Sequence, residues 1–339
     1  MQMLRVNVQD SVSYRRSCLT RHGFKRSFIV HSASKEVYSI LDDLLARVDD
    51  PTSEVRAVDV ALQTRAAGDL IGFGSYAQRP AVPKRIYTIE ELRLNGIQAE
   101  LLLSPRDTSL TFVRNAMQVS ALLGLGVLTL HGDVGQVLST AFGVIFALVF
   151  DQVANQGGGE ALLVDSVGRL LLPSYRSRVA LHEAGHFLIA YFVGVLPKTY
   201  TLTSLDAFLR FRKLNLQAGT QFCDKEFTDE IQSGKLSSSS LDRYTCVALA
   251  GVVTEYLRFG QAEGGIGDVL QLDGMFRALG FSQMKADGEV RWAVLNVAAI
   301  LRKYRVLQER IAEAMELGKP VGSMIEMIDE HVADELIGV

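Results

Sequence analysis

The feature that most constrains this chain is a pair of uncharged, apolar segments that lie close together in the sequence. Ala116–Leu130 and Val134–Phe150 contain no charged residue, and only three residues separate them. As helices they would be about 22 and 26 Å long, slightly short of the roughly 30 Å hydrocarbon core of a bilayer. Arginines flank the pair on both sides, and a helical hairpin would put both flanks on one side of a membrane. We therefore predict a membrane hairpin over 113–153; a buried hairpin of a soluble protein is the alternative.

The N-terminal segment has a different composition from the rest of the chain. Residues 1–33 contain six basic residues, one acidic residue and five serines. A segment rich in arginine and serine and poor in acids is typical of an organelle transit peptide. We predict a transit peptide over 1–33, with an ordinary basic tail as the alternative.

Charge and cysteine content exclude several kinds of function. The formal net charge is −3, so no basic field favours binding to nucleic acid. The three cysteines form no C-x-x-C pair, so a bound metal must be held by histidine and carboxylate side chains. A phosphate-binding G-x-x-x-x-G-K-[ST] loop is missing from the sequence, and we expect no ATPase activity from the chain alone.

The segment between the transit peptide and the apolar pair, residues 34–112, reads as a helical and linker region. Ser34 is the expected N-cap of a first helix, and glycines and prolines across 49–85 indicate a linker with one short helix. Thr88 and Glu91 form the capping-box pattern of another short helix. After the apolar pair, Gly157–Gly159 is interpreted as a second linker.

The strongest chemical signal is the sequence HEAGH, inside an apolar segment that is predicted to be a helix from an N-cap at Ser174 to Gly194. His182 and His186 are four residues apart, so a helix stacks them on one face, as two ligands of one zinc ion require. Glu183 is turned by about 100° and can lie beside the metal. Glutamate in this position can act as the general base that takes a proton from water.

The remainder of 160–339 is predicted to be a mostly α domain with a small β hairpin. Thr199–Thr203 and Thr220–Cys223 have the pattern of short strands. A helix is expected to follow Ser237, and apolar positions across Ala293–Tyr304 recur at the spacing of a helix that faces the core.

Two further motifs give the domain a family resemblance. HEAGH, then AGVVTEYLRFG at Ala250–Gly260 and GGIGDVLQLD from Gly264, resemble the peptidase domain of FtsH-type zinc proteases over about residues 173–335. The resemblance implies a helical, zincin-type fold over 160–339, and it places the third zinc ligand at Asp268 and a family glutamate at Glu255. The similarity is greatest to a plant and algal plastid subgroup that lacks the AAA ATPase module.

The chain departs from the family in three ways. It has no ATPase module, so we expect an AAA ATPase subunit or self-association as a partner. The asparagine that usually precedes the ligand aspartate is Gly267. The span from His186 to Asp268 is long, 268 − 186 = 82 residues.

The predicted function is a zinc-dependent endopeptidase that acts on protein substrates in quality control at a chloroplast membrane, the thylakoid or the envelope. Two alternatives stay open. A site-2-type intramembrane protease also pairs HExxH with a downstream LDG, and Leu272–Gly274 would then make Asp273 the third ligand. The other alternative is a catalytically silent, protease-like scaffold subunit. If neither aspartate binds the metal, Glu255 is the next candidate.

Overall fold

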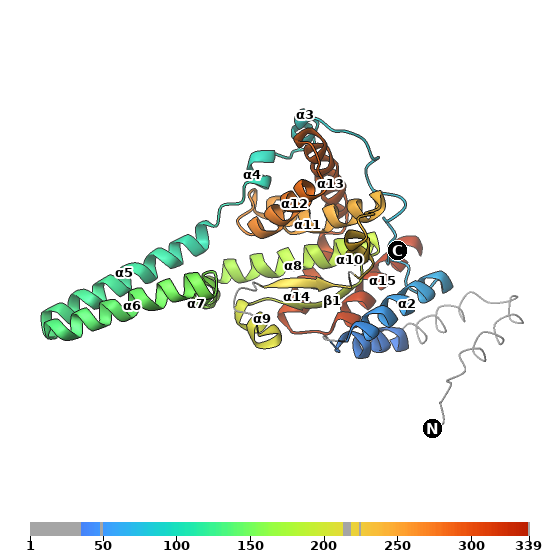
Figure 1. Ribbon diagram of the computed structural model, residues 1–339. Coiled ribbons are helices and arrows are strands. Elements are labelled where there is room, and N and C mark those ends of the chain that lie inside the picture. Colours follow the sequence, from blue (N-terminus) through green and yellow to red (C-terminus); the bar gives the residue numbers. More distant parts are fainter. Residues whose placement is uncertain (1–34, 48–49, 213–217, 224, 338–339) are drawn as a thin grey trace, which may run out of the picture.

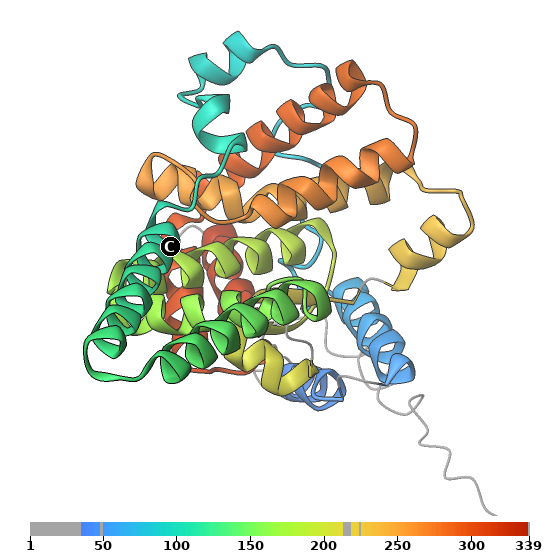
Figure 2. The ribbon, with the colours of Figure 1, turned by 60° about the vertical axis from the view of Figure 1, so that its left-hand side comes forward.

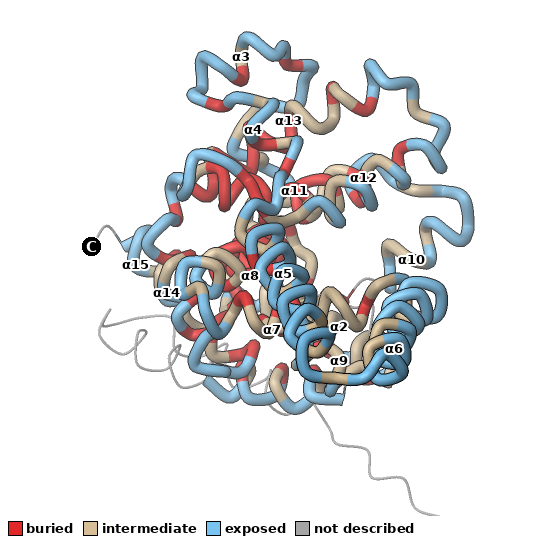
Figure 3. Tube along the Cα trace, turned by 90° about the vertical axis from the view of Figure 1, so that its left-hand side faces the viewer, coloured by how far each residue is buried: buried red, intermediate tan, exposed pale blue. Residues whose placement is uncertain are grey.

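Two long helices, α8 (Pro173–Val193) and α11 (Ser238–Phe259), form the centre of the fold. The computed structural model describes residues 35–47, 50–212, 218–223 and 225–337, and this part of the chain is mostly helical, as predicted. Every residue from Ala180 to Val193 is buried. Figure 3 shows the buried segments gathered around α8 and α11.

The ends of α8 follow from its sequence. Gly194 closes the helix with a left-handed φ of 86°, as predicted. The predicted N-cap at Ser174 is wrong, because the helix already begins at Pro173. Proline fits this first position since its fixed φ suits a helix and its missing N–H has no intrahelical partner there.

The helices of the C-terminal half pack around this pair, α13 against α11 and α14 against α8. The predicted core face of α13 and the residue after it is confirmed, since Ala293, Val297, Ile300 and Tyr304 are all buried. The bounds of the C-terminal helices are α12 Ile266–Ala278, α13 Gln283–Lys303, α14 Arg305–Glu316 and α15 Val321–Ile337.

A two-stranded antiparallel sheet packs on α8. It consists of β1 (Pro197–Thr201) and β2 (Gly219–Phe222), so the predicted small β hairpin is confirmed. Helix α9 (Ser204–Phe211) follows β1, and α10 (Lys225–Gln232) follows β2.

The N-terminal segment is more ordered than the sequence suggested. Residues 35–45 are helical, as predicted, and the predicted linker over 49–85 contains a helix longer than expected, the 17-residue α2 (Pro51–Ala67). Asp50 caps α2 by accepting a hydrogen bond from Thr52 N, and Pro51 occupies its first turn. The helix expected within this linker is confirmed, and the difference is its length of 17 residues. The transit-peptide prediction for 1–33 and the Ser34 cap lie outside the described residues.

A buried carboxyl joins this N-terminal segment to the centre of the fold. Asp329 on α15 accepts hydrogen bonds from Gly72 N (2.8 Å), Tyr191 OH (2.8 Å) and Tyr38 OH (3.2 Å). Burial raises the pKa of Asp329 to about 6 although these three donors act to lower the pKa. Tyr191 lies in the last turn of α8. The hydrogen bonds of Asp329 therefore fix the N-terminal region against the C-terminal end of that helix.

Two short helices precede the apolar pair. The capping box of Thr88 and Glu91 is confirmed at α3 (Ile89–Leu94). Helix α4 (Ala99–Leu103) follows. Residues 101–109 run from the last turn of α4 into the first turn of α5, and they contact the turn that joins α11 to α12. We call residues 101–109 the strap.

The apolar pair forms a helical hairpin that projects from the body (Figure 1). Helices α5 (Thr108–His131) and α6 (Val134–Ala154) are both long and apolar enough to cross a membrane. Only 6% of the most apolar window of α5 is buried, and none of that of α6. The alternative of a hairpin buried in the chain's own core is therefore not what the structure shows.

The predicted glycine linker after α6 is also replaced by a helix. Helix α7 (Gly158–Leu171) begins immediately after Gly157, which has a φ of 77°. Both carboxylate oxygens of Asp151 accept backbone N–H bonds from the first turn of α7. Figure 2 shows α7 running back along the base of the hairpin toward the body.

Candidate metal centre

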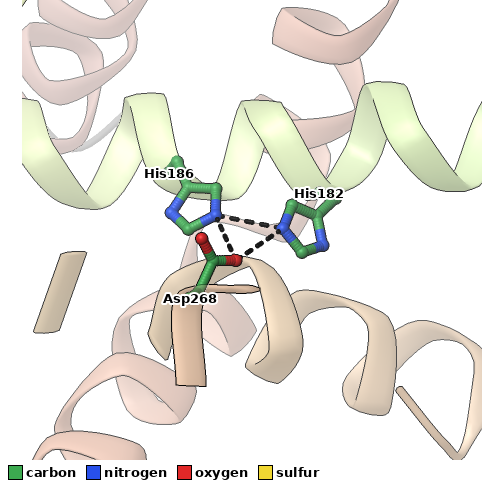
Figure 4. A group of neighbouring side chains, drawn as sticks. All are labelled: His182, His186 and Asp268. Atoms are coloured by element: carbon green, nitrogen blue, oxygen red, sulfur yellow. Dashed lines mark hydrogen bonds and ion pairs between the residues drawn. The ribbon is translucent and has the colours of Figure 1, made fainter. Parts of the chain in front are cut away.

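His182 and His186 lie one turn apart on α8 and are both buried. Their Nε2 atoms are 3.0 Å apart, and the two rings meet edge to face (Figure 4). The four-residue spacing in the sequence has placed both imidazoles on one face, as a helix requires.

Asp268 reaches the same point from the first turn of α12. Its Oδ2 lies 3.2 Å from His182 Nε2 and 3.4 Å from His186 Nε2. The three residues form a group that could hold a metal ion. Asp273 lies further along α12 and pairs with Arg277 at 2.6 Å.

The opposite ring nitrogens fix the tautomers of the two histidines. His186 Nδ1 donates to the carbonyl of Val247 at 2.8 Å, and His182 Nδ1 donates to Glu255 Oε1 at 2.7 Å. A neutral imidazole that donates from Nδ1 has a lone pair on Nε2. In that neutral form, both lone pairs point at the position where Asp268 Oδ2 lies.

The charges around the histidines favour ionised carboxylates. Burial alone would raise the pKa of Glu255, but hydrogen bonds from His182 and two backbone N–H groups lower it to about 2. The pKa of Asp268 is likewise held far below its usual range by His186 and His182, against the effect of burial. Burial alone would lower the pKa of His182, but contact with Asp268 and Glu255 raises it well above its ordinary value. The cluster thus attracts a positive charge.

This donor set fits a zinc ion. Two imidazole Nε2 atoms and a carboxylate oxygen converge within 3.4 Å, an approach that needs either a shared proton or a metal cation between them. Ligand atoms of a tetrahedral zinc ion are about 3.3 Å apart at usual bond lengths, close to the spacing seen here. Two histidines and one carboxylate are also a known zinc ligand set that leaves a fourth position open.

Glu183 lines the same cavity as His182, His186 and Asp268, which we call the trio. The cavity has a volume of about 1320 Å³, and its lining includes His182, His186, Asp268 and Glu183. Thr220 on β2 donates a 2.8 Å hydrogen bond to Glu183 Oε2, which fixes the direction of that carboxylate.

Glycines allow α8 and α11 to approach closely at the site. A Cβ on Gly251 would lie 2.1 Å from His182 Nε2, and a Cβ on Gly185 would lie 2.2 Å from Thr254 Oγ1. Real Cβ atoms do not approach other atoms so closely. Both positions therefore require glycine, which explains the glycine in each of the two motifs.

The structure brings His182, His186 and Asp268 together and places Glu183 on the wall of the same cavity, and it gives Glu255 a different place. Glu255 contacts Nδ1 of His182, on the far side of the ring from the trio. Sequence reasoning missed Thr220, the partner of Glu183, and Arg178, which pairs with Glu255 at 3.1 Å. No local pattern marks either residue, since each lies far from its partner in the sequence.

Comparisons with protein-family models, curated proteins and solved structures find no match to this chain. The interpretation of the site therefore rests on its geometry and on the motifs.

Proposed function

We propose that this protein is a zinc-dependent endopeptidase attached to a membrane by the α5–α6 hairpin. The observation that carries the proposal is the convergence of His182, His186 and Asp268 at one point, with Glu183 beside them in an open cavity. The FtsH-type motifs that name the same residues support the proposal independently of the geometry.

Zinc, when bound by His182, His186 and Asp268, supplies a Lewis acid that lowers the pKa of water to about 7 and polarises a peptide carbonyl. Glu183 accepts a proton from the attacking water, and it can then deliver this proton to the amine that leaves. Thr220 holds the Glu183 carboxylate in one direction by its hydroxyl bond. Glu255 and the Val247 carbonyl keep both histidines in the tautomer that presents Nε2.

The strand next to Glu183 suggests how a polypeptide substrate is bound. All four residues of β2 line the cavity, and β2 pairs on one side only, with β1, within the described part of the chain. A free strand edge can accept an extended peptide through main-chain hydrogen bonds. An extended segment of a protein substrate, added along β2, would pass the Glu183 carboxylate.

The cellular setting is proposed from two features. The exposed apolar hairpin supports attachment to a membrane, and the composition of residues 1–33 supports import into a plastid. Together with the motifs, they favour protein quality control at a thylakoid or envelope membrane, with an AAA ATPase subunit or a second copy of the chain as partner.

Glu183→Gln tests the endopeptidase proposal. Glutamine keeps the shape of the side chain but cannot accept a proton, so cleavage of an unfolded casein substrate should fall by about 10²–10⁴-fold. Zinc content should stay near that of the unchanged protein, because Glu183 is not a proposed ligand. Glu313→Gln on the exposed face of α14 is the matched control and should cleave normally. Equal cleavage by the Glu183 variant, or none by the unchanged protein, would leave a scaffold function.

Membrane attachment is tested by extraction of the native protein from membranes with alkaline carbonate. The exposed apolar faces of α5 and α6 should keep the protein in the pellet. Added protease should reach both flanks of the hairpin from the same side. Recovery of the protein in the soluble fraction would instead assign these apolar faces to a protein partner.

A further inference from the structure

The strap lies against the turn that leads into α12, the helix that carries the proposed metal ligand Asp268. This turn, Gly260–Gly265, joins α11 to α12. The backbone N–H of Ala262 donates to Leu101 O at 3.1 Å, and the N–H of Arg106 donates to Ala262 O at 3.3 Å. Two main-chain hydrogen bonds of Ala262 thus join the strap to the turn.

Side chains of the first turn of α5 add a second connection. Thr108 Oγ1 donates to Glu263 Oε1 at 2.8 Å, and Ser109 Oγ donates to Glu263 Oε2 at 2.7 Å. Glu263 belongs to the same turn and is buried. Each oxygen of this buried carboxylate therefore has a hydroxyl donor from the base of the apolar hairpin.

Glu263 is in turn connected to the metal centre. Its Oε1 lies 3.5 Å from Arg178 Nη2, and Arg178 Nη1 donates to Glu255 Oε2 at 3.1 Å. The backbone N–H of Glu263 also donates to Glu255 Oε2, at 2.8 Å. Glu255 then accepts from His182 Nδ1. A chain of polar contacts therefore runs from Thr108 and Ser109 to a residue of the trio.

We infer that the base of the apolar hairpin positions the metal centre, and that Thr108, Ser109 and Glu263 are positioning residues for His182 and Asp268. The inference rests on the proposed function, whose metal site it deepens. Partners of a ligating histidine commonly change metal affinity by 10–100-fold when they are lost. Here the partner of His182 is itself held by the turn, and the turn is held by the strap.

The test uses the full chain in detergent with cobalt(II) as the probe, because its visible absorption reports the ligand geometry. The double variant Thr108→Val, Ser109→Ala removes both hydroxyls and leaves the trio, Glu255 and Arg178 unchanged. We expect cobalt affinity, measured by competition with a chelator, to fall by about tenfold, at the lower end of the range for lost partners of a ligand. The absorption spectrum should change with it.

Two controls separate the hydroxyl bonds from a general effect on α5. The exchange Thr108→Ser, Ser109→Thr keeps both hydroxyls and should keep the affinity of the unchanged protein. Ser120→Ala removes a hydroxyl of α5 that bonds only to its own helix, at Ala116 O, and should also have no effect. If the double variant does not fold, the same cobalt affinity and absorption spectrum are measured for Ser109→Ala, which removes one of the two hydroxyl bonds to Glu263.

The possible results are distinguishable. Unchanged affinity and spectrum in the hydroxyl-free variant would overturn the inference and leave the proposed metal site intact. Equal loss in the exchange variant would also overturn it, since the hydroxyls would then not be the cause. Failure of the unchanged protein to bind cobalt or zinc would overturn both the inference and the proposed function.

Discussion

Asp268→Ala should lower zinc affinity by more than about a hundredfold and abolish proteolysis. Loss of an outer partner of a ligand already costs 10–100-fold, and this change removes a proposed ligand atom that lies 3.2 and 3.4 Å from the two Nε2 atoms. Zinc content after dialysis against a weak chelator, together with casein cleavage, measures both effects.

Asp273→Ala is the matched control on the same helix. Asp273 pairs with Arg277, an exposed neighbour one turn away, and is not part of the trio. Exposed pairs four residues apart on a helix typically contribute only about 0.3–0.5 kcal/mol, so zinc binding and cleavage should be unchanged. The opposite result, with Asp273 essential and Asp268 dispensable, would assign the protein to the site-2-type class.

Gly251→Ala should abolish metal binding although residue 251 is not a ligand. The added Cβ would lie within 2.4 Å of three atoms of the His182 ring. The ring cannot turn away without losing its 2.7 Å bond to Glu255. We expect loss of bound zinc and of activity, and a decrease of about 1–3 kcal/mol in the free energy of unfolding, as in other overpacked cores.

Gly274→Ala on α12 separates this clash from the general effect of replacing a helical glycine. Nothing lies within 4 Å of a Cβ at this exposed position. Alanine there should stabilise the protein by up to about 1 kcal/mol through its higher helix propensity, with zinc content unchanged. Thermal unfolding and zinc content of the two variants, compared side by side, decide the prediction. Normal zinc content in Gly251→Ala would contradict the close approach of α11 to His182.

The sequence predicted the parts of the site that depend on local spacing. The relative placement of His182, Glu183 and His186 follows from their spacing along one helix. The helix end at Gly194 and the capping box at Thr88 follow local rules for helix termini. The family motifs pointed to Asp268 across 82 residues, which spacing alone could not do. The positions of these residues agree with the sequence analysis because each depends on a single helix or on a family motif.

The incorrect linker and N-cap predictions have one cause: glycine and proline were interpreted as residues that interrupt helices. Pro51 and Pro173 each occupy the first turn of a helix, and Gly157 precedes another, yet all three lie in or beside segments that were read as linkers or caps. At helix ends these residues favour rather than prevent a helix. Asp50 before Pro51 is a recognisable start signal that composition alone obscured.

The contacts of the site that the sequence did not predict are those made by tertiary packing. Thr220, Arg178 and Glu263 act through partners 37, 77 and 155 residues away in the chain. Their roles follow from the positions of β2, the turn before α12 and the base of α5, which depend on the whole fold. No periodicity or motif in the sequence encodes these contacts.

The close contact of α8 with α11 also has a consequence for the thermodynamics of metal binding. His182 is confined by Gly251 on one side and by Glu255 on another, and His186 is held by the Val247 carbonyl. The rotamers of both side chains are therefore restricted when the protein folds, before any ion arrives. The entropy lost in ordering them belongs to folding rather than to association, so more of the coordination energy remains as affinity.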